Sequence, residues 1–172
     1  MKIQTTLFIF LIVFIISCVS NKPVYIPKTE CNVLHFDVKT GDINGVKPDF
    51  SQEHIKEWFP CYTLVVADGS HQSCGGTIYY AAHGFKYVTF WDYVEIEPGF
   101  KGTCSDNLMG KNLSDALQYL GTPDTTRINN PDPFIHFFNA EYGCLRIHTD
   151  SLGTIKKIAS HYYFCDQIEF CD

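Results

Sequence analysis

Histidine and cysteine residues are the first candidates for chemistry in this sequence. His71 and Cys74, with Cys61 nearby, are ligand types that zinc accepts, and the His-x-x-Cys spacing is part of a zinc motif. No second Cys-x-x-Cys or His-x-x-x-His pair completes a tetrahedral set, and cysteines of an exported protein are more often joined to each other. We therefore predict no metal and no cofactor.

A catalytic cysteine needs a histidine that takes its proton, and Cys74 with His83 or His161 can be drawn in these roles. Nothing in the local sequence selects this arrangement over others. Gly75 and Gly76 are typical of a turn or bulge, and they lack the following Lys-Ser/Thr of a phosphate-binding loop. This set therefore does not predict an enzyme.

Two carboxylates, Glu95 and Glu97, are two residues apart on a predicted strand and so share one face, as in a glycosidase pair. Two carboxylates at this spacing on an exposed strand are usually a solvated face that prevents edge pairing. A chain of this size without a coherent catalytic set predicts a binding protein, so we expect no enzyme activity.

The N-terminus carries an export signal. Lys2 precedes an apolar run, Leu7–Ile16, of about half the length that spans a bilayer. The run ends in Ile15-Ile16-Ser17-Cys18, which resembles the lipobox of bacterial lipoproteins. The resemblance implies that residues 1–17 are removed and that Cys18 is lipidated. An ordinary cleaved secretory signal is the alternative.

On the lipoprotein reading, the residue after the lipidated cysteine is Val19 and not the Asp associated with inner-membrane retention. We therefore expect the chain in the bacterial cell envelope, anchored by its lipid in the outer membrane and facing the periplasm. The membrane is then a partner only through the N-terminal lipid.

Charge excludes one class of partner. Removal of residues 1–17 leaves 155 residues with 12 basic and 19 acidic side chains, a net charge of −7. The longest basic run is Lys156-Lys157, so the clustered cations that a nucleic acid or an anionic membrane surface requires are missing. This length suits one domain or two small modules that share a core.

Eight cysteines in 172 residues fit an oxidising compartment. Lipidation of Cys18 leaves seven, so at most three disulfides form and one thiol remains, whereas an unmodified Cys18 allows four. Spacing does not decide the connectivity. The candidate pairs are Cys61 with Cys74 and Cys165 with Cys171.

Two helices are predicted. The first begins after Ser51, which can cap it, and ends at Pro60, with an apolar stripe of Ile55, Trp58 and Phe59. The second is Leu113–Leu120, closed by Gly121-Thr122-Pro123.

Period-two segments follow each helix. They are Thr77–Tyr80, Phe85–Trp91 and Tyr93–Ile96 after the first helix, and Phe134–Phe138, Cys144–His148 and Thr154–His161 after the second. Landmarks such as Ser51 and Ser114 recur about 60 to 65 residues apart.

The pattern predicts an α+β fold of two similar modules, residues 42–103 and 104–172, each a short helical element packed on an antiparallel β-meander. Residues 18–41 form a tether and N-terminal segment. Chance similarity between two α+β stretches is the alternative.

The second module resembles a known family. Its Gly110, the Leu-Gly-Thr-Pro at 120–123, Gly143 and the run 150–155 look like the SmpA/OmlA (BamE-like) lipoproteins and the β-lactamase inhibitor protein. The resemblance covers residues 108–162 and is looser over 42–97. It implies a short helical pair on an antiparallel sheet, a tandem pair of modules, and a sheet face that meets partner proteins.

The alternation of side chains along the predicted strands indicates which face of the sheet would meet a partner. If helices cover the apolar side, the opposite side carries a mixture of aromatic and polar side chains typical of protein interfaces. The candidate partner-binding residues are Tyr87, Trp91, His136, Arg146 and His148. Burial of Tyr87 and Trp91 in the core is the alternative.

The function expected is that of an exported, lipid-anchored module that binds a protein partner in the cell envelope. The acidic charge favours an inhibitor or immunity-like protein that blocks a periplasmic toxin or enzyme. A structural accessory of outer-membrane assembly is the alternative, and a small secreted hydrolase is the third choice.

Overall fold

The computed structural model describes residues 30–67, 76–128 and 134–168, and within them the fold is α+β. Its elements, in chain order, are β1 His35–Asp37, β2 Asp42–Ile43, α2 Gln52–Trp58, β3 Leu64–Val66, β4 Thr77–Tyr80, the 3-10 turn η1 Ala81–His83, β5 Phe85–Val88, β6 Tyr93–Ile96, β7 Thr103–Cys104, the 3-10 turn η2 Ser105–Asn107, α3 Leu113–Leu120, β8 Thr125–Arg127, β9 Phe134–Ala140, β10 Gly143–Thr149 and β11 Ile155–His161.

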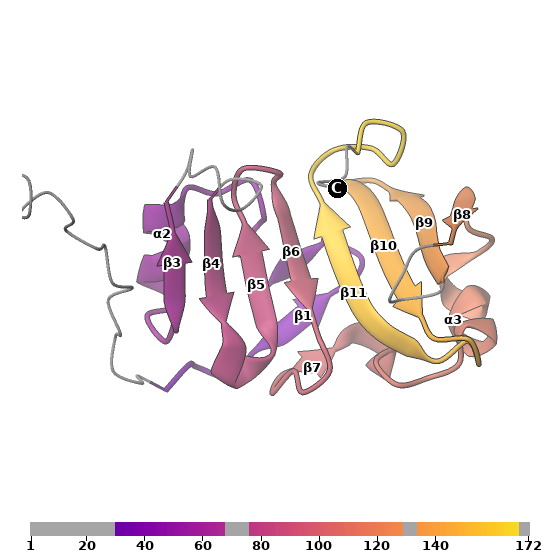
Figure 1. The fold of residues 1–172 in the computed structure, drawn as a ribbon, viewed down its shortest axis with the longest axis horizontal. Helices are drawn as coiled ribbons and strands as arrows, with labels where there is room; N and C mark the ends of the chain where they lie inside the picture. The colour runs from indigo at the N-terminus through magenta and orange to yellow at the C-terminus, as the bar shows by residue number, and fades with distance from the viewer. Residues whose placement is uncertain (1–29, 68–75, 129–133, 169–172) are drawn as a thin grey trace, which may run out of the picture.

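An eight-stranded antiparallel sheet dominates the structure, in the order β3-β4-β5-β6-β11-β10-β9-β8 (Figure 1). Strands β3 to β6 form one meander and β8 to β11 form another, and each follows a helix. The meanders join where β6 pairs with β11, with Val94 opposite Ser160. The chain thus builds one continuous sheet.

One face of this sheet is covered by α2, α3 and a small three-stranded sheet of order β2-β1-β7, which lie behind it in Figure 1. We call it the covered face. Ile55 of α2, Phe59 at its C-cap and Ala116 of α3 are buried there in the main core, together with Phe36 of β1. Part of the segment 18–41 therefore belongs to the domain core.

The opposite face, which we call the open face, carries Lys86, Tyr93, Glu95, Arg146, His148 and His161. No helix among the described residues covers it, and it is turned toward the viewer in Figure 1.

Both predicted helices are confirmed. The Ser51 hydroxyl caps α2 and accepts a hydrogen bond from the His54 N–H at 3.3 Å. Helix α3 is capped by Gly121, whose N–H donates to the Leu117 carbonyl at 3.0 Å and whose φ of 77° turns the chain out of the helix. Within the described residues, neither helix is long and apolar enough to cross a membrane.

The predicted strand Phe85–Trp91 is wrong at its end. Strand β5 ends at Val88, and Trp91 lies in the turn to β6, where its N–H donates to the Val88 carbonyl at 3.3 Å. Asp92 has a φ of 43°, which reverses the chain and ends the alternation of sides. Trp91 is therefore half-buried in a turn and does not lie on a strand face.

The predicted faces of Tyr87 and His136 are also wrong. Tyr87 lies on the covered face and is fully buried. In the β9–β10 pairing, His136 is opposite Ile147 and Phe137 is opposite Arg146. Odd-numbered residues of β9 therefore share a face with even-numbered residues of β10. His136 thus lies with Ile147 on the covered face.

Two disulfides link the described cysteines, and neither is a predicted pair. Cys61 is bonded to Cys31 and Cys165 to Cys144, with Cα–Cα distances of 5.2 and 4.9 Å. Cys144 lies at the start of β10, opposite the end of β11, so the segment after β11 meets it first. The other members of the predicted pairs, Cys74 and Cys171, lie outside the described residues, as does Cys18.

Tyr87 gives a test of the core. Its ring packs against Phe59, Tyr80 and Phe85, and its hydroxyl donates to the Val46 carbonyl at 2.8 Å. We expect Tyr87→Ala to lower the free energy of unfolding by about 3 to 5 kcal/mol, and Tyr87→Phe by about 1 kcal/mol.

Urea unfolding of both variants checks this expectation. Tyr119→Ala is the matched control, because Tyr119 on α3 is 63% exposed, and it should change the free energy of unfolding by less than about 0.5 kcal/mol. Equal losses for Tyr87→Ala and Tyr119→Ala would contradict the burial of Tyr87.

Candidate functional site

A row of side chains crosses the open face at the join between the two meanders. The register places Lys86 opposite Glu95, Glu95 opposite Ala159, and Ala159 opposite Arg146. Because alanine has only a methyl group, the long Arg146 side chain reaches over β11 to the carboxylate on β6. The row thus brings together charges from both meanders.

Glu95 is the centre of this ion-paired row. Its Oε1 lies 2.7 Å from the Lys86 Nζ, and its Oε2 accepts a hydrogen bond from the Arg146 Nη2 at 3.0 Å. Glu95 is only 4% exposed and Arg146 only 7%. The Lys86 Nζ also contacts the Glu97 Oε1 at 2.9 Å. Both carboxylate oxygens of Glu95 are therefore paired, as a buried charge requires.

The ion pairs decide the charge states in the row. Burial alone would raise the pKa of Glu95, but Lys86 and Arg146 outweigh it and hold that pKa well below its usual range. Burial alone would lower the pKa of Lys86, but the Glu95 carboxylate raises it above its usual range. Glu95 and Lys86 both remain charged at neutral pH.

Aromatic rings lie beside the row. The Arg146 Cζ is 5.2 Å from the centroid of the Tyr93 ring, a cation–π contact, and the His161 ring is 4.7 Å from Tyr93, centroid to centroid. Burial, and then the charge of Arg146, lower the pKa of His161 well below its usual range. His161 is therefore neutral at neutral pH, and its Nε2 is buried without a hydrogen-bond partner among the described residues.

Of the five predicted partner-binding residues, the structure brings Arg146 and His148 together on the open face. Both are buried. Tyr87 and His136 lie on the covered face, where His136 contacts the Thr126 and Thr149 hydroxyls at 3.0 and 3.2 Å. Trp91 lies in the β5–β6 turn.

Sequence reasoning missed Lys86 and Tyr93, and it considered Glu95 only as half of a carboxylate pair. One signal was available for Lys86 and Glu95. They have opposite charges on adjacent strands of a predicted hairpin, which is a favourable cross-strand pair. No signal of this kind connects Arg146 to Glu95, because 51 residues separate them.

The structure describes only some members of the alternative chemical sets. The Glu95 and Glu97 carboxylates share the Lys86 ammonium. His83 lies near Cys31 and Cys61, with all three ligand atoms within 4.8 Å of one another, but the two sulfur atoms are joined as a disulfide. His71 and Cys74 lie outside the described residues.

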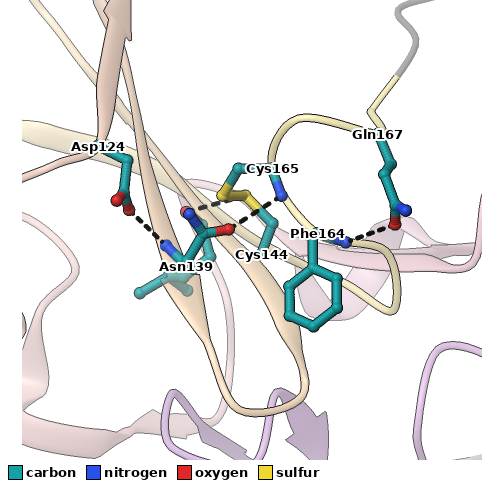
Figure 2. The surroundings of a disulfide bond; sticks show 7 residues. Asp124, Asn139, Cys144, Phe164, Cys165 and Gln167 are labelled. Carbon is teal, nitrogen blue, oxygen red and sulfur yellow. Dashed lines mark hydrogen bonds between the residues drawn. A yellow bond between two sulfur atoms is a disulfide. The ribbon is translucent and has the colours of Figure 1, made fainter.

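A second disulfide fixes the C-terminal segment at the edge of the open face. Figure 2 shows the Cys144–Cys165 bond, beside which the Asn139 Oδ1 accepts a hydrogen bond from the Cys165 N–H at 3.2 Å. Asp124 accepts from the Asn139 N–H at 2.7 Å. Ile168 packs with these cysteines in a small apolar cluster. The segment therefore covers part of the face formed by β9 and β10.

One described cysteine, Cys104 of β7, is not in a disulfide. It is buried, and burial raises the pKa of its thiol to about 11. Both properties prevent the thiolate from forming at the surface, so the folded protein does not offer Cys104 for pairing with another molecule.

No family model, no curated protein and no solved structure matches this chain.

Glu95→Gln tests the ion-paired row. Removing one partner of a buried ion pair leaves the others uncompensated, so we expect the free energy of unfolding at pH 7 to fall by about 3 to 5 kcal/mol. Glu97→Gln is the matched control, because Glu97 is 40% exposed, and it should cost less than about 1 kcal/mol.

The pH dependence gives a second readout. A lowered carboxyl pKa stabilises the folded state fully above the ordinary glutamate pKa of about 4.3, and this stabilisation is lost as the pH falls toward the folded-state pKa. Chemical unfolding between pH 7 and pH 3 should show a steeper loss for the unmodified protein than for Glu95→Gln. Parallel curves would show that Glu95 is not held ionised by its neighbours.

Proposed function

We propose that this chain is an exported, lipid-anchored module that binds a protein partner in the bacterial cell envelope through the open face. The ion-paired row on that face is the observation that carries the proposal. The row includes Arg146 in contact with Tyr93, two residue types enriched in protein interfaces, on a sheet face that no helix of the described residues covers.

The energetics of the row support binding over a purely structural role. Buried ion pairs add little net stability compared with apolar side chains of the same size, because desolvation opposes the attraction. Apolar residues at the positions of Lys86, Glu95 and Arg146 would give the folded state a similar stability. Charges held in fixed positions just below the surface, with the Lys86 side chain 21% exposed, give a partner a defined electrostatic pattern to match, which is a source of specificity.

We further propose that the sheet consists of two similar modules in tandem. Its support is the topology, since α2 precedes the meander β3–β6 and α3 precedes the meander β8–β11. The two meanders meet side by side through β6 and β11. Together with the sequence resemblance to the β-lactamase inhibitor protein, this topology supports our proposal of an inhibitor or immunity-like role.

Export is supported by the disulfides Cys31–Cys61 and Cys144–Cys165, which suit an oxidising compartment. The lipid anchor rests on the Ser17-Cys18 junction of the sequence. We place the protein at the outer membrane, facing the periplasm.

The anchor is tested by Cys18→Ala. Without the acceptor thiol, the variant should lose incorporation of a labelled fatty acid and leave the membrane fraction. Cys104→Ala is the matched control, because Cys104 is buried, and it should label as the unmodified protein does. Undiminished labelling of Cys18→Ala would exclude the lipoprotein proposal.

The binding face is tested by a photoreactive phenylalanine analogue placed at Tyr79, which neighbours Lys86 on the open face and is half-buried. Irradiation of envelopes should give one discrete protein adduct. The same analogue at Tyr119, exposed on α3, should not give it.

Mass spectrometry of the adduct then identifies the kind of partner. A periplasmic enzyme or toxin supports the inhibitor role, and an integral outer-membrane protein supports an assembly accessory. An adduct of equal yield from both positions, or none from Tyr79, would exclude the open face as the binding surface.

A further inference from the structure

A groove of about 370 Å³ lies beside the end of β11 and the β9–β10 turn, and Lys86, Glu95 and Arg146 do not line it. It is formed by the C-terminal loop after β11, the β9–β10 turn and the segment around Lys47. We call it the aromatic groove, because Tyr142, Tyr162, Tyr163 and Phe164 all line it. Its volume lies in the range of small-ligand sites.

The aromatic side chains of the loop are unusually exposed. Tyr162, Tyr163 and Phe164 are 51%, 44% and 51% exposed, and no other stretch of the described residues has three consecutive large apolar side chains at the surface. Aromatic surface that stays exposed forgoes the stabilisation that its burial would give to the folded state. Such a cluster is typical of a surface that meets a ligand.

A disulfide and hydrogen bonds restrain the loop that forms the groove. The Cys144–Cys165 disulfide fixes one side of the loop, and the Phe164 N–H donates to the Gln167 Oε1 at 3.3 Å (Figure 2). The Tyr162 N–H donates to the Asp92 carbonyl at 2.9 Å. A prearranged site of this kind loses little conformational entropy on binding.

Tyr142 lines the side of the groove opposite the C-terminal loop, and its ring is held in place by Gly41. Its ring lies directly over Gly41, where a Cβ atom would overlap the ring. Gly41 also has a φ of 70°, a conformation that glycine adopts without strain. The closeness of the ring to the backbone at Gly41 fixes the position of this aromatic wall.

The polar groups of the groove indicate the charge of the ligand. Lys47 and Glu141 supply one cation and one anion, so an anionic or cationic ligand meets a like charge as well as an opposite one. Gln167 and Thr40 add neutral donors and acceptors. The lining therefore suits a neutral molecule that both donates and accepts hydrogen bonds.

We propose that the aromatic groove binds a neutral oligosaccharide. A pyranose ring presents C–H bonds on its faces, which stack on aromatic rings, and hydroxyl groups at its edge, which donate and accept hydrogen bonds. A proline-rich peptide also fits aromatic grooves, but its prolines offer carbonyl acceptors and no N–H donors for Glu141. A saccharide can therefore hydrogen-bond to more of the residues that line the groove than a proline-rich peptide can.

The test is a calorimetric titration of the full mature chain with three neutral hexasaccharides: a β-1,4-glucan, an α-1,4-glucan and a β-1,4-linked N-acetylglucosamine oligomer. We expect at least one of them to bind. Tyr162→Ala and Phe164→Ala should each weaken this binding by about tenfold or more, while Phe164→Tyr retains it. Tyr119→Ala, a change of an exposed tyrosine outside the groove, should leave it unchanged.

Thermal unfolding of each variant checks that its fold is intact. The loop side chains are about half-exposed, so the melting temperature should change by only about 2 °C. If Phe164→Ala unfolds, Tyr162→Ala and Phe164→Tyr still decide the result.

Four outcomes would overturn the proposal: binding of none of the hexasaccharides, equal weakening by Tyr119→Ala, tighter binding of an oligogalacturonate, or tighter binding of a proline-rich decapeptide.

Binding at the aromatic groove does not depend on binding at the open face. The Tyr79 photoadduct should persist in Phe164→Ala, so failure of one proposal leaves the other testable.

Discussion

The pairing of β6 with β11 is the constraint on which the rest of the structure depends. Each meander has only four strands, and the hydrogen bonds between these two strands turn them into one sheet of eight. The pairing also brings Glu95 within reach of Arg146, with only Ala159 between them. The same contact therefore creates the continuous sheet and the charged row that marks its open face.

The two faces of the sheet are stabilised by different interactions. The covered face buries apolar and aromatic side chains under the helices, and that burial provides the main favourable free energy of folding. On the open face, Glu95 loses most of its water and regains hydrogen-bonding partners from Lys86 and Arg146. Such a row adds little net stability compared with apolar side chains, and the binding role that we propose for the open face would account for it.

The disulfides act at the two ends of the described chain. Cys31–Cys61 ties the N-terminal segment to the end of α2, and Cys144–Cys165 holds the C-terminal loop to β10. Both limit the freedom of terminal segments, which otherwise fray in a small domain. In the second case the restraint also holds exposed aromatic side chains in one place. A stable domain thus carries two separate surfaces, the open face and the aromatic groove.

The sequence by itself determined the local elements of this protein. Ser51 marks the start of α2 because its hydroxyl accepts a hydrogen bond from a backbone N–H of the first turn. Gly121 marks the end of α3 because glycine adopts the backbone conformation that closes the last turn. The alternation of apolar and polar residues identified most strands. These signals are local. Only the tertiary structure decided the register that moved His136 to the covered face, the partners of Cys61 and the contact of Arg146 with Glu95. Such choices depend on energies between residues far apart in the chain, which no local pattern encodes.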